Sequence, residues 1–252
     1  MDLELKGKRA LITGGSRGIG KVIAQVLLSE GVDVALLARG RDALESAAKS
    51  LAAESGRRVL PLVADTSKKA DVDAAVHQAI EVLGGVDILV NAAAIPGGSS
   101  SAATLDELVD EHLLHDVDVK VVGYLRTARA LAPHLVAKGW GRIINIGGLA
   151  AYHTGRTIAT LRNVGVSAVT KSLADELGPK GINVVALHPG ATRTERTDAA
   201  SEQRAAKNNT IGRIVDAKEV AYVVAFLASP KSVAINGDTI ATGGGSPGVI
   251  RY

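Results

Sequence analysis

The sequence predicts an α/β protein with a three-layer, doubly wound architecture built around a seven-stranded parallel sheet. Short runs rich in Val, Ile, Leu and Ala alternate along the chain with longer segments of helical periodicity. This alternation is typical of a parallel sheet that is covered by helices on both faces. In addition, the first apolar run leads directly into a glycine-rich segment that precedes a helical pattern.

Seven apolar runs are predicted to form the strands of the sheet. Each is four to six residues long, and most of their residues are apolar, as expected of strands that are buried on both faces. The runs cover residues 9–13, 33–38, 58–63, 88–91, 142–146, 183–188 and 238–242.

The segments between these runs are predicted to be helices. Residues 19–27 place their apolar side chains at helical spacing, and Gly31 stands where the glycine after a helix C-terminus belongs. The same interpretation applies to residues 42–55, 71–83 and 106–138. Right-handed crossovers then place helices on both faces of the sheet. Because no repeat or Pro-rich linker interrupts this order, residues 1–252 are predicted to form a single domain.

Composition excludes several classes of function. With 252 residues, 46% of them hydrophobic, the chain can bury a large core. It has no cysteine, which excludes disulfides, zinc–thiolate sites and cysteine nucleophiles, and no metal site is expected. The net charge of +3 is scattered and aromatic residues make up only 2%, so no nucleic-acid partner is expected. Without a signal peptide or a membrane-spanning run, we expect a cytoplasmic protein without membrane contacts.

The glycine-rich segment, Thr13-Gly14-Gly15-Ser16-Arg17-Gly18-Ile19-Gly20, follows the first predicted strand and opens a helix. Glycines let the backbone turn sharply and approach a diphosphate, whose charge meets the free amides at the helix N-terminus. An ordinary turn is the alternative, but the strand–loop–helix context favours a dinucleotide site and hence the Rossmann fold. The expected contacts are Gly14, Ser16, Arg17, Gly18, Ile19 and Gly20.

The pattern Thr-Gly-x-x-x-Gly-x-Gly resembles the fingerprint of the short-chain dehydrogenase/reductase family, and the resemblance extends over the whole chain. The end of the second predicted strand decides the expected cofactor. NAD-preferring Rossmann proteins carry an acidic residue there, whereas this chain has Arg39, and Arg17 offers a second cation. Two cations suit the extra phosphate of NADP(H), which is therefore predicted in preference to NAD(H). Two surface arginines are the alternative.

The resemblance assigns further cofactor positions. Asp65, which follows the third strand, resembles the residue of the family that contacts the adenine. Asn91 is an amide side chain expected to brace the sheet. Pro189, Gly190 and Thr192 resemble a Pro-Gly turn whose threonine meets the nicotinamide carboxamide.

The resemblance also implies a catalytic Ser, Tyr and Lys, which hydride transfer needs because the developing alkoxide must be protonated. The segment 169–178 sets the register and places Ala159 at the Tyr position and Asn163 at the Lys position. Gly148 stands at the Ser position, and no Tyr-x-x-x-Lys occurs in the chain. Asp118 is expected where family members have a helical Asn. The chain is therefore identified as a divergent branch that lacks the usual catalytic residues.

Other side chains are candidates for the missing roles. Tyr152 and His153 follow the fifth strand, and either could move a proton if its pKa were tuned, although ordinary solvated loop residues are the alternative. Asn163 could hydrogen-bond a ribose hydroxyl as the missing lysine would. Arg156 and Arg162 could bind an anionic substrate, or could be surface charges.

Three functions remain open on the sequence. The first is an NADP(H)-dependent oxidoreductase that acts on a carbonyl or alcohol of a small-molecule substrate with a non-standard proton donor. The others are a non-redox lyase or isomerase, and a non-catalytic NADP(H)-binding regulatory or partner subunit. The polar segment 193–211 is predicted to be a substrate lid. A homo-oligomer, dimer or tetramer, is expected through residues 164–177 and 235–241.

Overall fold

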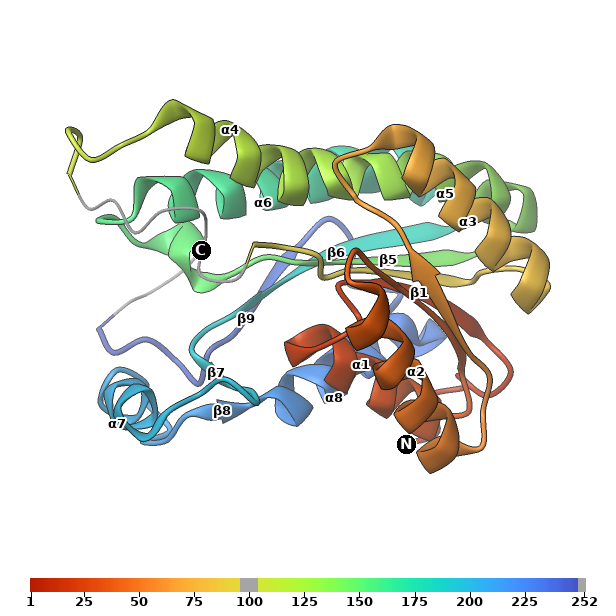
Figure 1. Cartoon of the computed structure of the whole chain (residues 1–252), viewed down its shortest axis with the longest axis horizontal. Helices are drawn as coiled ribbons and strands as arrows, with labels where there is room; N and C mark the ends of the chain where they lie inside the picture. The colour runs from red at the N-terminus through yellow and green to blue at the C-terminus, as the bar shows by residue number, and fades with distance from the viewer. Residues whose placement is uncertain (96–103, 249–252) are drawn as a thin grey trace.

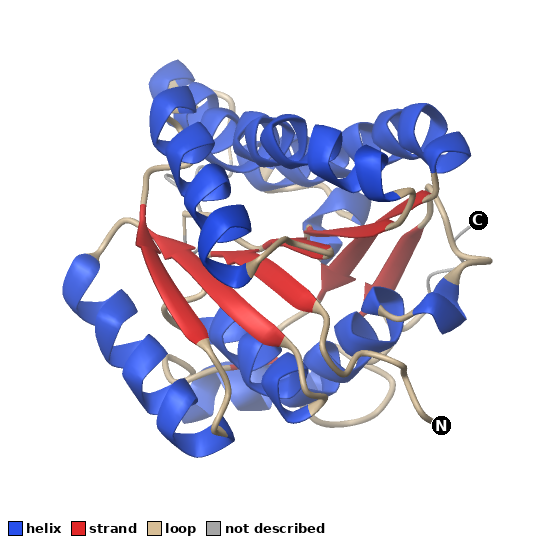
Figure 2. Ribbon diagram, turned by 90° about the vertical axis from the view of Figure 1, so that its right-hand side faces the viewer, coloured by secondary structure: helices blue, strands red, loops and turns tan. Residues whose placement is uncertain are grey.

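The computed structural model describes residues 1–95 and 104–248, which form one parallel seven-stranded sheet between two layers of helices (Figure 2). The strands lie in the order β3-β2-β1-β4-β5-β6-β9, and all neighbouring pairs are parallel. The strand order reverses between β1 and β4, which is the switch point of a doubly wound sheet. The predicted fold class is confirmed.

The strands lie where the apolar runs predict them. Three have the predicted bounds, and the other four differ by one residue at one or both ends, since strand ends depend on pairing with neighbours. The strands are β1 (Arg9–Thr13), β2 (Asp33–Ala38), β3 (Val59–Val63), β4 (Ile88–Asn91), β5 (Gly141–Ile146), β6 (Ile182–Pro189) and β9 (Thr239–Thr242). A separate two-stranded ladder joins β7 (Thr192–Arg193) to β8 (Val215–Asp216).

The helices form two layers, which lie above and below the sheet in Figure 1. One layer contains α1 (Gly18–Ser29), α2 (Arg41–Ser55) and α8 (Ala217–Ala228). The other contains α3 (Lys69–Leu83), α4 (Asp110–Val117), α5 (Gly123–Lys138) and α6 (Thr157–Leu177), while α7 (Ala199–Lys207) lies beside the β7–β8 ladder. Within the described ranges, no helix combines the length and apolar character that crossing a lipid bilayer requires.

Each face of the sheet has its own hydrophobic core. Successive side chains of a strand point to opposite faces, so neighbouring residues of β1 enter different cores. Ile12 packs in the core beneath α1 and α8, whereas Leu11 packs in the core with α3 and α5. This double burial explains why the strands are nearly continuous apolar runs.

The long helical segment predicted over 106–138 is divided in the structure. The helices α4 and α5 are joined by a π-helical turn, η1 (Asp118–Val122). Its residues Val119, Val121 and Val122 are β-branched and are followed by Gly123, and all four are weak α-helix formers. A π turn carries one extra residue, so it rotates the following side chains relative to a regular helix.

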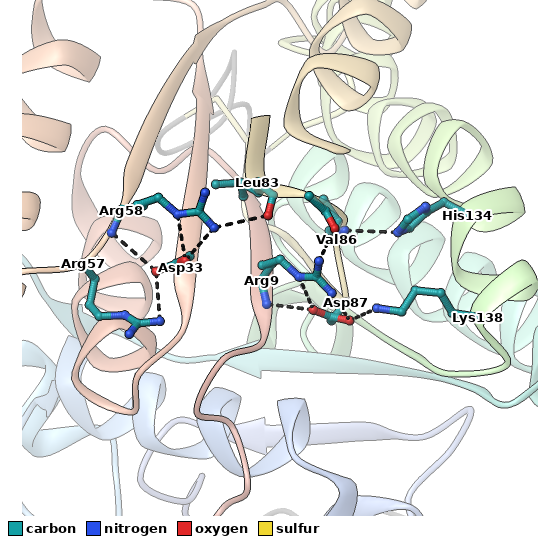
Figure 3. A network of polar contacts seen from close by, with 10 residues as sticks. Arg9, Asp33, Arg57, Arg58, Leu83, Val86, Asp87, His134 and Lys138 are labelled. Atoms are coloured by element: carbon teal, nitrogen blue, oxygen red, sulfur yellow. Dashed lines mark hydrogen bonds and ion pairs between the residues drawn. The ribbon is translucent and has the colours of Figure 1, made fainter. Parts of the chain in front are cut away.

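Two ion-pair groups, drawn in Figure 3, lie at the amino ends of β1, β2 and β4, whereas the glycine-rich loop follows the carboxyl end of β1. The carboxylate of Asp87 is buried and lies 2.9 Å from Nε of Arg9, and it also pairs with Lys138. Asp33 pairs with Arg57 and Arg58 at 3.0 Å each. These contacts join strands to helices at the amino ends of the strands, away from the glycine-rich loop, so we assign them a structural role.

Replacing Asp87 by asparagine is expected to lower the free energy of unfolding at pH 7 by about 2 kcal/mol, because two cations lose their buried anion. Burial raises the pKa of Asp87, but hydrogen bonds from Arg9 and Lys138 outweigh it and hold the pKa below its ordinary value. The contribution is therefore complete above a pH of about 4 and disappears as the pH falls through the pKa of the folded protein. Urea denaturation at several pH values measures this.

The control for this variant is Asp73→Asn, which removes an exposed pair with Lys69 on α3. That substitution should cost less than about 0.5 kcal/mol, because exposed ion pairs contribute little. Equal losses at the two positions, or a loss at Asp87 that does not shrink in acid, would contradict the assigned role.

Candidate cofactor and active site

A cleft of about 550 Å³ opens at the carboxyl ends of the strands. Its walls come from the loop between β1 and α1, from the end of β2, and from the segments that follow β3, β4, β5 and β6. Ligands of doubly wound sheets bind beyond the carboxyl ends of the strands, at the switch point. The cleft therefore lies where the sequence places a dinucleotide.

The glycine-rich loop has the close approaches that a phosphate cradle needs. Gly14 has a φ of 70°, and a Cβ there would lie 2.7 Å from the carbonyl oxygen of Ala92. A Cβ on Gly20 would lie 2.4 Å from the carbonyl oxygen of Gly14. Both neighbours are backbone atoms that cannot move aside, so a side chain at either position is excluded. The loop thus holds the N-terminus of α1 against the cleft and fits the diphosphate of a dinucleotide.

Nine of the twelve predicted cofactor residues line the cleft. Pro189 ends β6 just before the lining residue Gly190, and the neighbours of Asp65 line the cleft although Asp65 itself does not. Burial raises the pKa of Asp65, but hydrogen bonds from Ser67 and the nearby charge of Arg39 lower it overall. The lining residues are Gly14, Ser16, Arg17, Gly18, Ile19, Gly20, Arg39, Gly190 and Thr192.

Asn91 lies beneath the cleft floor in a chain of buried hydrogen bonds. Its Nδ2 donates to Oδ1 of Asn145 at 2.9 Å, and its Oδ1 accepts from Thr127 Oγ1 at 2.7 Å. Asn145 in turn donates to Thr170 Oγ1 at 2.9 Å. These contacts tie β4 and β5 to α5 and α6, so they fix the strand ends on which the cleft is built.

A carboxylate from a distant segment occupies the N-terminus of α1. The backbone N–H of Gly18 donates to both oxygens of Glu195, at 3.1 and 3.2 Å. Helix N-termini stabilise anions, and the diphosphate of a dinucleotide would use the same N–H groups. Glu195 must therefore leave this position when a dinucleotide binds.

Replacing Glu195 by alanine is expected to tighten NADPH binding by about two- to fivefold, since a carboxylate on a helix N-terminus contributes about 0.3–1 kcal/mol. The measurement is titration of NADPH fluorescence at low ionic strength. Glu54→Ala is the matched control, because it removes one negative charge from the exposed end of α2. Weaker binding by the Glu195 variant would show that this carboxylate supports the cleft and does not compete for it.

Two of the three predicted catalytic candidates, Tyr152 and His153, are neighbours after β5, and the third, Asn163, lies on α6. Tyr152 lies in the short 3-10 helix η2 (Leu149–Tyr152), with its ring centroid 5.6 Å from that of His188, and His153 follows it as an exposed residue. Neither residue lines the cleft as the described residues form it. Asn163, in contrast, is buried directly behind the cleft wall. The loop position predicted from the sequence therefore does not bring Tyr152 and His153 to the cofactor cleft.

Two glycines stand where a serine would crowd the site. A Cβ on Gly147 would lie 2.8 Å from the ring of His188, and a Cβ on Gly148 would lie 3.2 Å from Nδ2 of Asn163. His188 is fully buried, with Nδ1 2.7 Å from the carbonyl oxygen of Gly148 and Nε2 3.1 Å from Ser167 Oγ. The backbone N–H of Gly148 also lies 3.3 Å from Nδ1. His188 is therefore held in place by hydrogen bonds on both ring nitrogens.

Lys120 is the residue that the sequence analysis missed. It lies in the π turn η1, is 5% exposed and lines the cleft. Its Nζ donates to Oδ1 of Asn163 and to the carbonyl oxygen of Gly147, at 2.9 Å each. Asp118, two residues earlier, instead pairs with Arg126 at 2.6 Å. The π turn directs Lys120, and not Asp118, toward the site.

A second buried ion pair lies beside this lysine. Arg162 is 8% exposed and pairs with Asp116, which is fully buried, so the surface interpretation of Arg162 is wrong. Its Nη1 also donates to the carbonyl oxygen of Ile95 at 3.3 Å. Two basic groups and one acidic group are thus buried near one another, with Lys120 in the cleft wall and Arg162 paired to Asp116. The surplus positive charge favours either an anionic group in the cleft or a neutral Lys120.

The segment 193–211, predicted as a lid, begins at the cleft. Thr194 and Arg196 line it, and the residues that follow form α7. Arg17, Arg39 and Arg196 therefore surround the cleft with guanidinium groups that suit phosphates.

The chain is similar to known proteins over nearly its whole length. Residues 14–246 match the family described as enoyl-(acyl carrier protein) reductase. The 3-oxoacyl-[acyl-carrier-protein] reductase FabG of Vibrio cholerae is 33% identical over 248 residues, which cover 96% of this chain and 98% of that protein.

Two solved structures share the fold. The L-sorbose reductase of Gluconobacter frateurii, complexed with NADPH and L-sorbose, has a TM-score of 0.91 and 31% identity over 99% of this chain and 100% of that chain. A short-chain dehydrogenase of Burkholderia cenocepacia, in complex with NADP, has a TM-score of 0.85 and 33% identity over 96% of this chain and 98% of that chain. The cleft described above thus belongs to a fold that holds this cofactor in both relatives.

Proposed function

The chain belongs to the short-chain dehydrogenase/reductase family, and from this premise we propose that it is an NADP(H)-dependent oxidoreductase that interconverts a carbonyl and an alcohol on a small molecule. The cleft is the observation that supports this proposal, because its glycine-rich loop fits a diphosphate and its arginines suit a further phosphate. NADPH-complexed L-sorbose reductase and the NADP complex from Burkholderia cenocepacia support the choice of cofactor.

The chain's own residues have separable tasks in this proposal. Bound NADP(H) supplies or accepts a hydride. The segment from Gly14 to Gly20 would hold the diphosphate, Arg39 and Arg17 would hold the adenosine phosphate, and Thr192 would contact the nicotinamide carboxamide. The segment 193–211 closes over the bound substrate, which gives it the role of a lid.

The proton donor is the part of the site that departs from the family pattern. Ala159 has no hydroxyl, and its carbonyl oxygen accepts a hydrogen bond from Nδ2 of Asn163 at 2.8 Å. We therefore include a non-standard proton donor in the proposed function. The same absence favours the second candidate, a non-catalytic subunit that binds NADP(H) and regulates or supports a partner. Exposed apolar residues of α6, Leu161 and Val164, are consistent with assembly into a homo-oligomer.

The experiment that tests the proposal combines binding with turnover. Titration with NADPH and with NADH should give tighter binding of NADPH, and a panel of ketones, sugars and 3-oxoacyl thioesters should reveal NADPH oxidation, followed by absorbance. Tight NADPH binding without oxidation of any compound would favour the non-catalytic subunit. Failure to bind either nucleotide would overturn both candidates.

A further inference from the structure

Four ionisable side chains line the cleft as the described residues form it: Arg17, Arg39, Lys120 and Arg196. The guanidinium group of arginine keeps its proton under all physiological conditions. Of these four groups, only the amine of Lys120 can therefore release and regain a proton near neutral pH. A reaction that needs proton transfer inside this cleft has one candidate among its ionisable wall residues.

The hydrogen bonds of Lys120 leave one position on its nitrogen for a ligand. Nζ donates to Gly147 O and Asn163 Oδ1, and neither oxygen can donate in return. The orientation of the Asn163 amide is fixed, because its Nδ2 donates to Ala159 O at 2.8 Å. A protonated amine carries three N–H groups and a neutral amine carries two N–H groups and a lone pair. The third position can therefore change between donor and lone pair while both hydrogen bonds persist.

The surroundings of Lys120 favour exchange of that proton near neutrality. Burial lowers the pKa of Lys120 to about 7, the charge of Arg162 acts in the same direction, and Asp116 opposes the shift. On α5, which also packs against η1, Tyr124 donates to Ile146 O at 2.9 Å and Arg126 pairs with Asp118. The groups on α4, α5 and α6 that approach this lysine are thus engaged with other partners, and Lys120 remains the one that meets the cleft.

We propose that Lys120 is the proton donor of the carbonyl reduction and the proton acceptor of the reverse oxidation, in place of the tyrosine that the family uses. This assignment rests on the proposed function. As a hydride adds to the carbonyl carbon, the carbonyl π pair moves to oxygen, and the N–H bond of Lys120 breaks while an O–H bond forms. The electron pair of that N–H bond stays on nitrogen. Water then returns a proton to the neutral amine.

Asn163 is a positioning residue in this arrangement. It occupies the position at which the family carries its lysine, and its Oδ1 holds the amine that comes from η1. In this chain the amine therefore comes from Lys120 in the π turn η1, and not from a lysine on α6 as in the family pattern. The amide of Asn163 on α6 orients that amine. Gly148 leaves the space that this amide occupies, since a Cβ there would lie 3.2 Å from Nδ2.

The first experiment measures protonation without any substrate. Protein grown with lysine labelled with carbon-13 at Cε is titrated by NMR, and the resonance of Lys120 is assigned by its absence from the Lys120→Gln variant. The Lys120 resonance should titrate with a midpoint near pH 7. If Lys120 titrated above a pH of about 9.5, like an ordinary lysine, the amine would stay charged in the neutral range and the proposal would be wrong.

The second experiment separates proton transfer from binding, using the carbonyl compound that the wild-type protein reduces. Lys120→Arg keeps the charge and Lys120→Gln keeps a donor, but neither can give up a proton near neutral pH. Both should bind NADPH within about threefold of wild type. Their single-turnover rates of hydride transfer should fall by about 100-fold or more. The wild-type rate should decrease as the pH rises through the neutral range, whereas the residual rate of the variants should not.

Lys171→Gln is the control, since Lys171 is exposed on α6 and pairs with Asp175. It should keep the wild-type rate and pH profile. Rates within threefold of wild type in both Lys120 variants would overturn the assignment while leaving the proposed function intact. If the wild-type protein reduced no carbonyl compound, the proposed function itself would be wrong. The NMR midpoint would then decide separately whether Lys120 can exchange its proton.

Discussion

Replacing Gly20 by alanine is expected to weaken NADPH binding by about 10- to 100-fold. The added Cβ would lie 2.4 Å from the carbonyl oxygen of Gly14 and 3.0 Å from its carbonyl carbon. Both atoms belong to the loop backbone, so the loop must move away from α1 to relieve the overlap. Overpacking of this kind costs about 1–3 kcal/mol, and the displaced loop no longer aligns its N–H groups on a diphosphate.

Calorimetric titration of NADPH measures this loss, and Gly56→Ala provides the control. Gly56 follows α2 with a φ of 65°, and a Cβ added there would meet no other atom within 4 Å. Alanine at this position therefore strains the backbone by about 1 kcal/mol without touching the cleft. The two variants should lose similar stability but differ in NADPH affinity. Tight NADPH binding by the Gly20 variant would show that the loop does not hold the diphosphate.

Replacing Arg39 by alanine is expected to weaken NADPH binding by about 10- to 100-fold while changing NADH binding little. Arg39 follows β2 directly and lines the cleft with an exposed side chain. A charge-assisted hydrogen bond to a phosphate contributes about 1.5–3 kcal/mol, and the phosphate is the group by which the two nucleotides differ. Parallel titrations with NADPH and NADH measure the ratio, which should approach one.

Arg41→Ala is the matched control for this prediction. Arg41 lies two residues further along, pairs with Glu45 at 3.1 Å and is absent from the cleft wall formed by the described residues. Its removal should leave the ratio of the two affinities unchanged. An Arg39 variant that loses affinity for both nucleotides equally would show that Arg39 supports the loop and does not select the phosphate.

Much of the fold follows from local patterns. The strands lie within one residue of the apolar runs at each end, and the segment from Gly14 to Gly20 forms the expected loop after β1 and the first turn of α1. Strands that are buried on both faces need apolar residues, and close backbone approaches need glycine. Both features can therefore be recognised in the sequence. Nine of the twelve residues predicted for the cofactor therefore lie along the cleft, and their individual contacts with a cofactor stay predictions.

The catalytic end could not be predicted in this way. A regular helix over 106–138 would turn by about 100° per residue, and the extra residue of the π turn changes which side chain faces inward. The resemblance placed Asp118 at the position of the family's helical Asn, whereas the structure directs Lys120 to Asn163, 43 residues away in the sequence. Likewise, no local pattern connects Arg162 with Asp116 or Glu195 with Gly18.

The sequence by itself determined the α/β class, the strands and the dinucleotide loop, because these depend on backbone conformation and on the burial of neighbouring residues. Only the tertiary structure decided which charged groups meet behind the cleft wall. The hydrogen bond of Lys120 with Asn163 and the ion pair of Arg162 with Asp116 join η1, α4 and α6. The relative placement of these elements depends on how the helices pack on the sheet. A buried amine in contact with an amide is a property of that packing, and neither residue alone indicates it.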